Sequence, residues 1–218
     1  MIRLAIFDLD GTLLDTIADL GEACNHALRQ HGFPTHDLDC YPKMVGNGVN
    51  KLLERALPEG HKEEETVLLL KQDFVDYYNE HNRIHTHPYE GIPEVLKALK
   101  ENGIQMAVAS NKYQEATRTL ITHFFGENTF SIVLGERAGI ARKPDPKIVL
   151  DILQFFEGIR PGEVLYIGDS DVDMQTAKNA GLASIGCTWG FCTKEKLAAE
   201  HPDYLIDNAE EILQIALK

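Results

Sequence analysis

The chain has 218 residues, of which 44% are hydrophobic, and it carries a formal net charge of −13 at pH 7. This size and composition predict a substantial hydrophobic core, either in one large domain or in a core with a smaller appendage. The acidic charge argues against nucleic acid or an anionic membrane as a partner, because both bind basic surfaces. No apolar stretch is long enough to span a bilayer, the first residues lack the layout of a signal peptide, and the four cysteines form no CxxC pair. We therefore expect a cytoplasmic protein with reduced thiols.

The first predicted element is a buried strand over residues 2–7, which runs directly into Asp8 and Asp10. Helical periodicity begins at Asp19 and continues, with no convincing strand, to about Arg83. Strand and helix patterns then alternate, with strands expected over residues 104–111, 131–135, 163–169, 182–186 and 204–206. A last helix is expected to open at Asn208, with Glu211 completing a capping box.

This alternation of apolar strands and helices predicts a parallel sheet covered on both faces. The fold class is therefore α/β, a doubly wound, Rossmann-like core interrupted after its first strand by a helical insertion. We predict that residues 1–15 and 87–218 form the core and that residues 16–86 form the inserted domain.

Carboxylates follow two of the predicted strands. Asp8 and Asp10 end the first, and Asp169 and Asp173 follow the strand over residues 163–169. Ligands of open α/β sheets bind beyond the carboxyl ends of the strands, so we expect these acids to meet there if the two strands are neighbours. Two bare charges about 4 Å apart repel by about 4 kcal/mol at an effective dielectric constant near 20. An oxygen-only ligand set that needs a cation favours Mg²⁺, which commonly keeps a phosphate oxygen among its ligands.

Phosphate would complete such a site. Ser110 and Asn111 end a strand just before a helix, where a hydroxyl and backbone N–H groups can hold phosphoryl oxygens. Lys143 supplies a fixed cation, ahead of a helix that Asp145 is expected to cap and Pro146 to begin. An acidic chain can thus bind an anion through one metal, one lysine and helix N-termini.

Four ordered motifs carry a family resemblance: Asp8-x-Asp10-Gly11-Thr12, Ser110, Lys143-Pro144 and Gly168-Asp169-Ser170-x-x-Asp173. In order and spacing they resemble the four motifs of the haloacid dehalogenase superfamily. The resemblance implies that Asp8 is a nucleophile that forms an aspartyl-phosphate, and that Asp10 is the acid/base. It also implies that Ser110 orients the phosphoryl group and Lys143 neutralises it.

The same resemblance assigns the metal and the insertion. Asp169 is expected to bind Mg²⁺ with Asp8 and the backbone carbonyl of Asp10, while Asp173 supports these ligands. Thr12 and Asn111 are expected to contact the substrate, and Thr12 also to orient a catalytic carboxylate. The helical insertion resembles the C1 cap of this superfamily.

The second aspartate, Asp10, argues for phosphoryl transfer and against dehalogenation. The segments VGNGVNKLLERAL, FVDYYNEH, SNK and TWGF resemble bacterial phosphoglycolate phosphatases, which implies a small phosphorylated metabolite, 2-phosphoglycolate, as substrate. Pyrophosphatase, another small-phosphate phosphatase and a β-phosphoglucomutase-like phosphotransferase stay open as alternatives. So does a non-enzyme, a receiver-like signalling domain that holds a phosphate on an aspartate.

Three features of the sequence have two interpretations each. Gly46, Asn47 and Gly48 are expected to bring backbone N–H groups to a substrate carboxylate, although a simple capping turn explains them equally well. Trp189 either packs in the core or lines the pocket. The histidines near the end of the insertion have no zinc-ligand spacing and are interpreted as surface or hinge residues: His81, His85 and His87.

Overall fold

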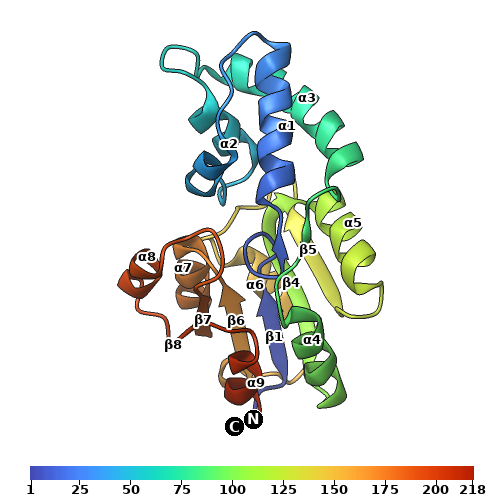
Figure 1. Ribbon diagram of the computed structural model, residues 1–218. Coiled ribbons are helices and arrows are strands. Elements are labelled where there is room, and N and C mark those ends of the chain that lie inside the picture. Colours follow the sequence, from blue (N-terminus) through green and yellow to red (C-terminus); the bar gives the residue numbers. More distant parts are fainter. The chain divides into compact units, whose positions relative to one another are not determined.

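The computed structural model describes residues 1–218, and its centre is a six-stranded sheet in the order β5-β4-β1-β6-β7-β8. Every neighbouring pair in this sheet is parallel, as Figure 1 shows. The strands are β1 (Leu4–Phe7), β4 (Gln105–Tyr113), β5 (Ile132–Glu136), β6 (Val164–Gly168), β7 (Ala183–Cys187) and β8 (Tyr204–Ile206). The predicted doubly wound α/β fold is confirmed.

Strand β1 shows why its sequence is apolar throughout. Ala5 and Phe7 lie in the hydrophobic cluster on one face of the sheet, and Leu4 and Ile6 lie in the cluster on the other face. All four side chains are fully buried. Side chains alternate across a strand, so a strand covered on both faces needs apolar residues at every position.

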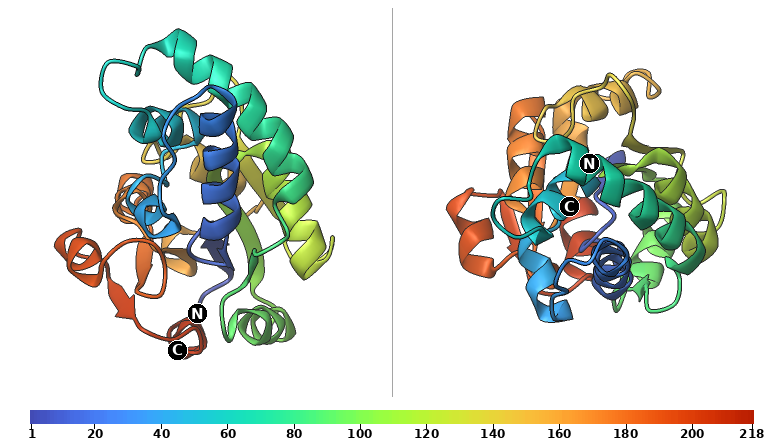
Figure 2. Two further views of the ribbon diagram at one scale, coloured as in Figure 1. Left: turned by 45° about the horizontal axis from the view of Figure 1, so that its top comes forward. Right: turned by 90° about the horizontal axis from the view of Figure 1, so that it is seen from above.

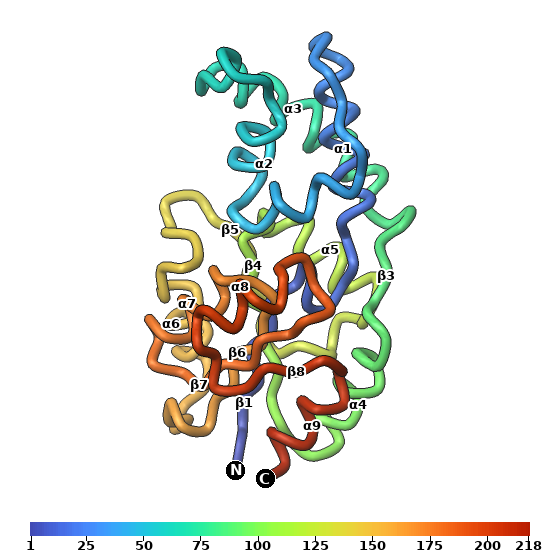
Figure 3. Tube along the Cα trace, turned by 60° about the vertical axis from the view of Figure 1, so that its left-hand side comes forward, coloured from blue at the N-terminus to red at the C-terminus, as the bar shows by residue number.

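Helices cover both faces of the sheet. Side chains of α4 (Ile92–Glu101), α5 (Gln114–Phe125) and α9 (Glu211–Ala216) pack in the cluster with Phe7, and those of α6 (Lys147–Leu153) and α7 (Asp171–Ala180) pack in the cluster with Ile6. A short helix η2 (Pro161–Glu163) precedes β6, and α8 (Lys194–Ala199) lies between β7 and β8. Both termini lie at the end of the sheet where β1 begins (Figure 3).

The chain divides into two compact units, one formed by Met1–Leu14 with Pro88–Lys218 and the other by Asp15–His87. The second unit contains α1 (Ile17–Gln30), a 3₁₀ helix η1 (Leu38–Lys43), α2 (Val49–Ala56) and α3 (Glu64–His81), with α1 and α3 packed against each other (Figure 2). Short strands β2 (Leu14–Asp15) and β3 (His87–Pro88) form a separate two-stranded sheet. None of the helices combines the length and apolar character that crossing a membrane requires.

The inserted unit is closed by a buried carboxylate. Asp19, at the start of α1, accepts hydrogen bonds from the backbone N–H groups of His85 and Thr86 and from the Thr86 hydroxyl, at 2.7–3.2 Å. These bonds satisfy a charge that is only 4% exposed, and they join the first helix of the unit to its last residues.

Three elements differ from the sequence-based expectation. Helix α9 begins at Glu211, although the Glu211 carboxylate does accept from the N–H of Asn208 at 3.1 Å; residues 209 and 210 form a turn. Helix α6 begins at Lys147, whose N–H donates to Asp145 at 2.8 Å. Helix α8 was not predicted because its six residues bury a single side chain, Leu197, and therefore show no periodicity.

Candidate active site

The ends of three adjacent strands bring the predicted motifs together. Phe7, the last residue of β1, pairs with Val108 of β4 and with Ile167 of β6. Asp8 follows Phe7, Ser110 lies two residues beyond Val108, and Asp169 lies two residues beyond Ile167. The condition for these acids to meet, that the first strand and the strand before Asp169 are neighbours, is therefore fulfilled.

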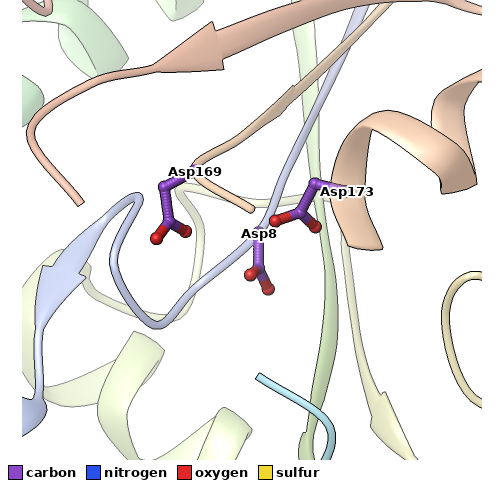
Figure 4. Close-up of side chains that lie close together, drawn as sticks. All are labelled: Asp8, Asp169 and Asp173. Carbon is purple, nitrogen blue, oxygen red and sulfur yellow. The ribbon is translucent and has the colours of Figure 1, made fainter. Parts of the chain in front are cut away.

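Three carboxylates converge at this edge. Oxygen atoms of Asp8, Asp169 and Asp173 all lie within 4.8 Å of one another, and all three residues are buried. Figure 4 shows the three side chains pointing toward one another, Asp173 from the first turn of α7. Three buried acids in one place need a compensating positive charge.

Lys143 supplies part of that charge. Its Nζ lies 2.9 Å from Oδ1 of Asp8 and donates to Oδ1 of Asp173 at 2.8 Å and to the carbonyl oxygen of Ala109 at 2.9 Å. Burial by itself would lower the pKa of the Lys143 ammonium, but Asp173 and Asp8 outweigh it and raise this pKa well above its usual value. These two acids therefore favour the charged form of Lys143.

One lysine does not balance three carboxylates. Burial, and next the charge of Asp173, raises the pKa of Asp8 from 3.8 to about 7, and burial raises the pKa of Asp169 well above its usual value. Oδ1 of Asp8 is buried and accepts no hydrogen bond, its contact with Lys143 being an ion pair. An excess of buried negative charge, presented by oxygen atoms alone, fits a hard divalent cation.

Two glycines let the backbone pass next to Asp169. A Cβ at Gly11, whose φ is +86°, would lie 2.3 Å from Oδ2 of Asp169, and a Cβ at Gly190 would lie 2.4 Å from the same oxygen. Neither position accepts a side chain without moving the carboxylate. The close approach of Gly190 to Asp169 was not predicted from the sequence.

Protein donors fix the orientation of Asp169. The Thr12 hydroxyl donates to Oδ1 at 2.9 Å, and the N–H of Phe191 donates to Oδ2 at 2.8 Å. Thr12 is fully buried, and its carbonyl oxygen accepts from the indole N–H of Trp189 at 3.2 Å. Thr12 thus contacts a carboxylate of the cluster, and its contact with a substrate stays a prediction. Trp189 packs against the core, and its lining of a pocket stays a prediction.

Asp173 is held by four donors. Oδ2 accepts from the N–H and the hydroxyl of Ser170, the N-cap of α7, and Oδ1 accepts from Lys143 and from the Tyr166 hydroxyl at 3.1 Å. The helix start and the acidic cluster therefore share one carboxylate. The contact of Tyr166 with Asp173 was not predicted, although a buried tyrosine hydroxyl usually has a hydrogen-bond partner.

Asp10 lies apart from the three converging carboxylates and contacts a different lysine. Nζ of Lys112 lies 3.0 Å from Oδ1 of Asp10. A second buried lysine, Lys112, therefore lies beside one of the motif acids, where a single lysine was expected at the site. The hydroxyl of Ser110 accepts from the N–H of Lys112 at 3.1 Å.

The side chain of Asn111 forms two hydrogen bonds with the backbone of Lys143. Its Oδ1 accepts from the Lys143 N–H at 3.0 Å and its Nδ2 donates to the Lys143 carbonyl at 3.1 Å. This pair of bonds connects the end of β4 to the loop that carries the lysine. Contact of Asn111 with a substrate stays a prediction.

The glycine pair of the inserted unit forms a loop held by an arginine. Gly46 and Gly48 have positive φ values of 104° and 81°, and Gly48 precedes α2 as its N-cap. Arg55 donates to Oδ1 of Asn47 at 2.7 Å and to the carbonyl oxygen of Met44 at 2.8 Å. A contact of residues 46–48 with a substrate stays a prediction.

The residues that form this site also match a known protein family. The family model described as haloacid dehalogenase-like hydrolase matches residues 5–187, a range that contains all four motifs. The chain belongs to this hydrolase family. The resemblance inferred from the motifs is confirmed.

Relatives and solved structures match this hydrolase over nearly its whole length. The phosphoglycolate phosphatase of Vibrio vulnificus (strain YJ016) is 35% identical, covering 99% of this chain and 96% of its own. That of Aquifex aeolicus (strain VF5) is 31% identical, covering 98% and 96%. The crystal structure of a predicted phosphoglycolate phosphatase from Haemophilus somnus 129PT has a TM-score of 0.90 at 31% identity, covering 98% of this chain and 97% of that one.

Proposed function

We propose that this hydrolase is a Mg²⁺-dependent phosphatase that acts through an aspartyl-phosphate on 2-phosphoglycolate. The observation that carries the proposal is the buried ion pair of Asp8 with Lys143, whose Nζ lies 2.9 Å from Oδ1 of Asp8. A nucleophile that must attack a phosphate dianion needs such a cation beside it. The family membership and the phosphoglycolate phosphatases among its relatives support the same activity.

Each acid has one role in the proposed reaction. A carboxylate oxygen of Asp8 attacks phosphorus, the bond to the leaving oxygen breaks, and Asp10 gives that oxygen its proton. Asp10 then takes a proton from a water molecule, which attacks the phosphorus of the phospho-aspartate and releases inorganic phosphate and free Asp8. Ser110 and Lys143 hold and neutralise the phosphoryl oxygens during both steps.

The residues that would hold Mg²⁺ are Asp8, Asp169 and the backbone carbonyl of Asp10. Asp173 would contribute through its effect on Lys143, because four protein donors already occupy its oxygens. When bound, the ion supplies positive charge to the phosphoryl oxygens.

The choice of 2-phosphoglycolate rests on the relatives and on the inserted unit. We assign Gly46, Asn47 and Gly48 to the carboxylate end of the substrate, since glycine lets a backbone approach a ligand closely. Pyrophosphate, hexose phosphates and other small phosphate esters are the competing substrates. Fold alone does not separate them.

A substrate panel tests this proposal. We expect Mg²⁺-dependent hydrolysis of p-nitrophenyl phosphate, its loss in excess EDTA, and its loss in Asp8→Asn. We also expect the highest kcat/KM for 2-phosphoglycolate. Activity that survives excess chelator or Asp8→Asn would contradict the phosphatase mechanism. A preference of tenfold or more, about 1.4 kcal/mol, for pyrophosphate or a hexose phosphate would contradict the substrate alone.

A further inference from the structure

Lys112 is a second buried lysine at the strand ends, and the reaction above gives it no role. Its side chain is 4% exposed, and its Nζ lies 3.0 Å from Oδ1 of Asp10, whose side chain is 20% exposed. Removing an ammonium from water is costly, and a buried ion pair is often no more stable than apolar residues of similar size. Stability alone therefore does not explain a lysine at this position.

The backbone of β4 directs Lys112 toward Asp10. The register of β4 with β5 shifts between Ala109 and Tyr113. In a regular strand Asn111 and Lys112 would face opposite sides of the sheet. Here the Asn111 amide bonds the backbone of Lys143 while the Lys112 ammonium reaches Asp10, and such irregularities commonly re-aim side chains beside active sites.

Several contacts fix the backbone of Lys112 in this position. Its N–H donates to the Ser110 hydroxyl at 3.1 Å, and its carbonyl oxygen accepts from the Thr117 hydroxyl at 3.1 Å. A Cβ on Gly135 would lie 2.5 Å from the same carbonyl oxygen, so β5 also packs tightly here. The ammonium is presented from a rigid support.

The two buried lysines act on different acids. Lys143 contacts Asp8 and Asp173, whereas Lys112 contacts Asp10. A carboxylate with one oxygen held by an ammonium has little freedom to rotate, so the direction of its second oxygen is also set. Proton transfer in the proposed reaction needs this carboxylate to be held in one direction.

We propose that Lys112 is a positioning residue for Asp10. It holds one carboxylate oxygen so that the other is oriented for proton transfer in both half-reactions. The proposal rests on the proposed function, because it takes Asp10 as the acid/base. Misplacing a catalytic group by about 1 Å can cost about 100-fold in rate, which makes the orientation measurable.

The test compares Lys112→Met with Lys97→Met, a matched loss of one lysine on the exposed face of α4, where Lys97 lies 3.9 Å from Glu101. We expect Lys112→Met to lower kcat by about 10-fold to 100-fold with KM within about threefold, and Lys97→Met to change neither. Because Asp10 also serves hydrolysis of the phospho-enzyme, this second step should become slow in Lys112→Met. The variant enzyme should then show a rapid, stoichiometric burst of p-nitrophenol before the slow steady state. Lys112→Gln is measured alongside and replaces Lys112→Met in the test if circular dichroism shows that the Met variant is unfolded.

A double-mutant cycle separates positioning from other roles. In an Asp10→Asn background, adding Lys112→Met should lower kcat by less than about twofold, because the carboxylate on which it acts is gone. A full loss in that background, a change confined to KM, or wild-type kcat in Lys112→Met would each overturn the proposal. Failure of the proposed function has a different signature, namely activity that survives Asp8→Asn.

Discussion

At the scale of single residues, the converging carboxylates outnumber the positive groups that contact them. Lys143 is shared between Asp8 and Asp173. Burial, and next the charge of Asp173, still leaves the pKa of Asp8 at about 7 and that of Asp169 well above normal. These raised pKa values describe the metal-free protein. A bound divalent cation would replace the protons that they imply.

This residue-scale argument predicts a pH-dependent response to Mg²⁺. The pKa of Asp8 in the folded, metal-free protein is about 7, above its ordinary 3.8, so the folded state binds a proton that the unfolded chain releases. The stability from that proton is complete below about pH 4 and is lost as the pH rises through 7. Mg²⁺ should therefore raise the unfolding temperature more at pH 8 than at pH 5.5.

Thermal unfolding followed by circular dichroism measures this difference. For a domain of this size about 1 kcal/mol corresponds to roughly 2–4 °C, so we expect the rise caused by Mg²⁺ to be at least about 2 °C larger at pH 8. Asp8→Asn should reduce the difference between the two pH values. An equal rise at both pH values in the unmodified protein would refute the charge argument.

At the scale of elements, the residues at the start of α7 both cap the helix and hold a carboxylate of the site. Ser170 caps the helix by accepting from the N–H of Asp173, and its own hydroxyl donates back to the Asp173 carboxylate. The helix cap is therefore also part of the network that holds Lys143. By contrast, Thr193 caps α8 through the N–H of Lys196 at 3.3 Å and bonds to none of the acidic residues of the site.

These two caps provide a matched pair of variants. Ser170→Ala and Thr193→Ala should each lower the free energy of unfolding by about 1 kcal/mol, because each helix loses its capping side chain. Only Ser170→Ala should also lower kcat, since it frees Asp173 to move relative to Lys143. Denaturant unfolding together with p-nitrophenyl phosphate turnover checks both effects; equal activity in the two variants would show that the cap is structural alone.

At the scale of the whole molecule, the chain combines a sheet unit that holds the acids with a helical unit that holds the glycine loop. In the helical unit, Arg55 bonds the Asn47 side chain and the carbonyl oxygens of Met44 and Val45, which keeps this loop in one conformation. If residues 46–48 bind the carboxylate end of the substrate, as proposed, they act on substrate choice and not on the phosphoryl transfer itself. Hydrolysis of 2-phosphoglycolate and hydrolysis of p-nitrophenyl phosphate should then respond separately to mutations in this loop.

We expect Asn47→Trp to lower kcat/KM for 2-phosphoglycolate by about tenfold or more, while p-nitrophenyl phosphate turnover changes by less than about threefold. Gln72→Trp, on the exposed side of α3 in the same unit, is the control and should alter neither. Parallel losses on both substrates in Asn47→Trp would argue that residues 46–48 affect folding or the acidic site instead of substrate choice.

The sequence by itself determined the α/β class, the buried first strand and the acids that end it. These features follow from local pattern, because a strand buried on both faces must be apolar and an acid at its end must have a partner. The convergence of Asp8, Asp169 and Asp173 was also predictable, since parallel strands end at the same edge of a sheet.

Only the tertiary structure decided which lysine faces which acid. The pairing of Lys112 with Asp10 occurs where the register of β4 with β5 shifts, and the contact of Tyr166 with Asp173 joins β6 to α7. The approach of Gly190 to Asp169 likewise joins residues 21 positions apart. The directions in which these side chains point are set by long-range contacts, whereas sequence periodicity indicates only which face of an element is buried.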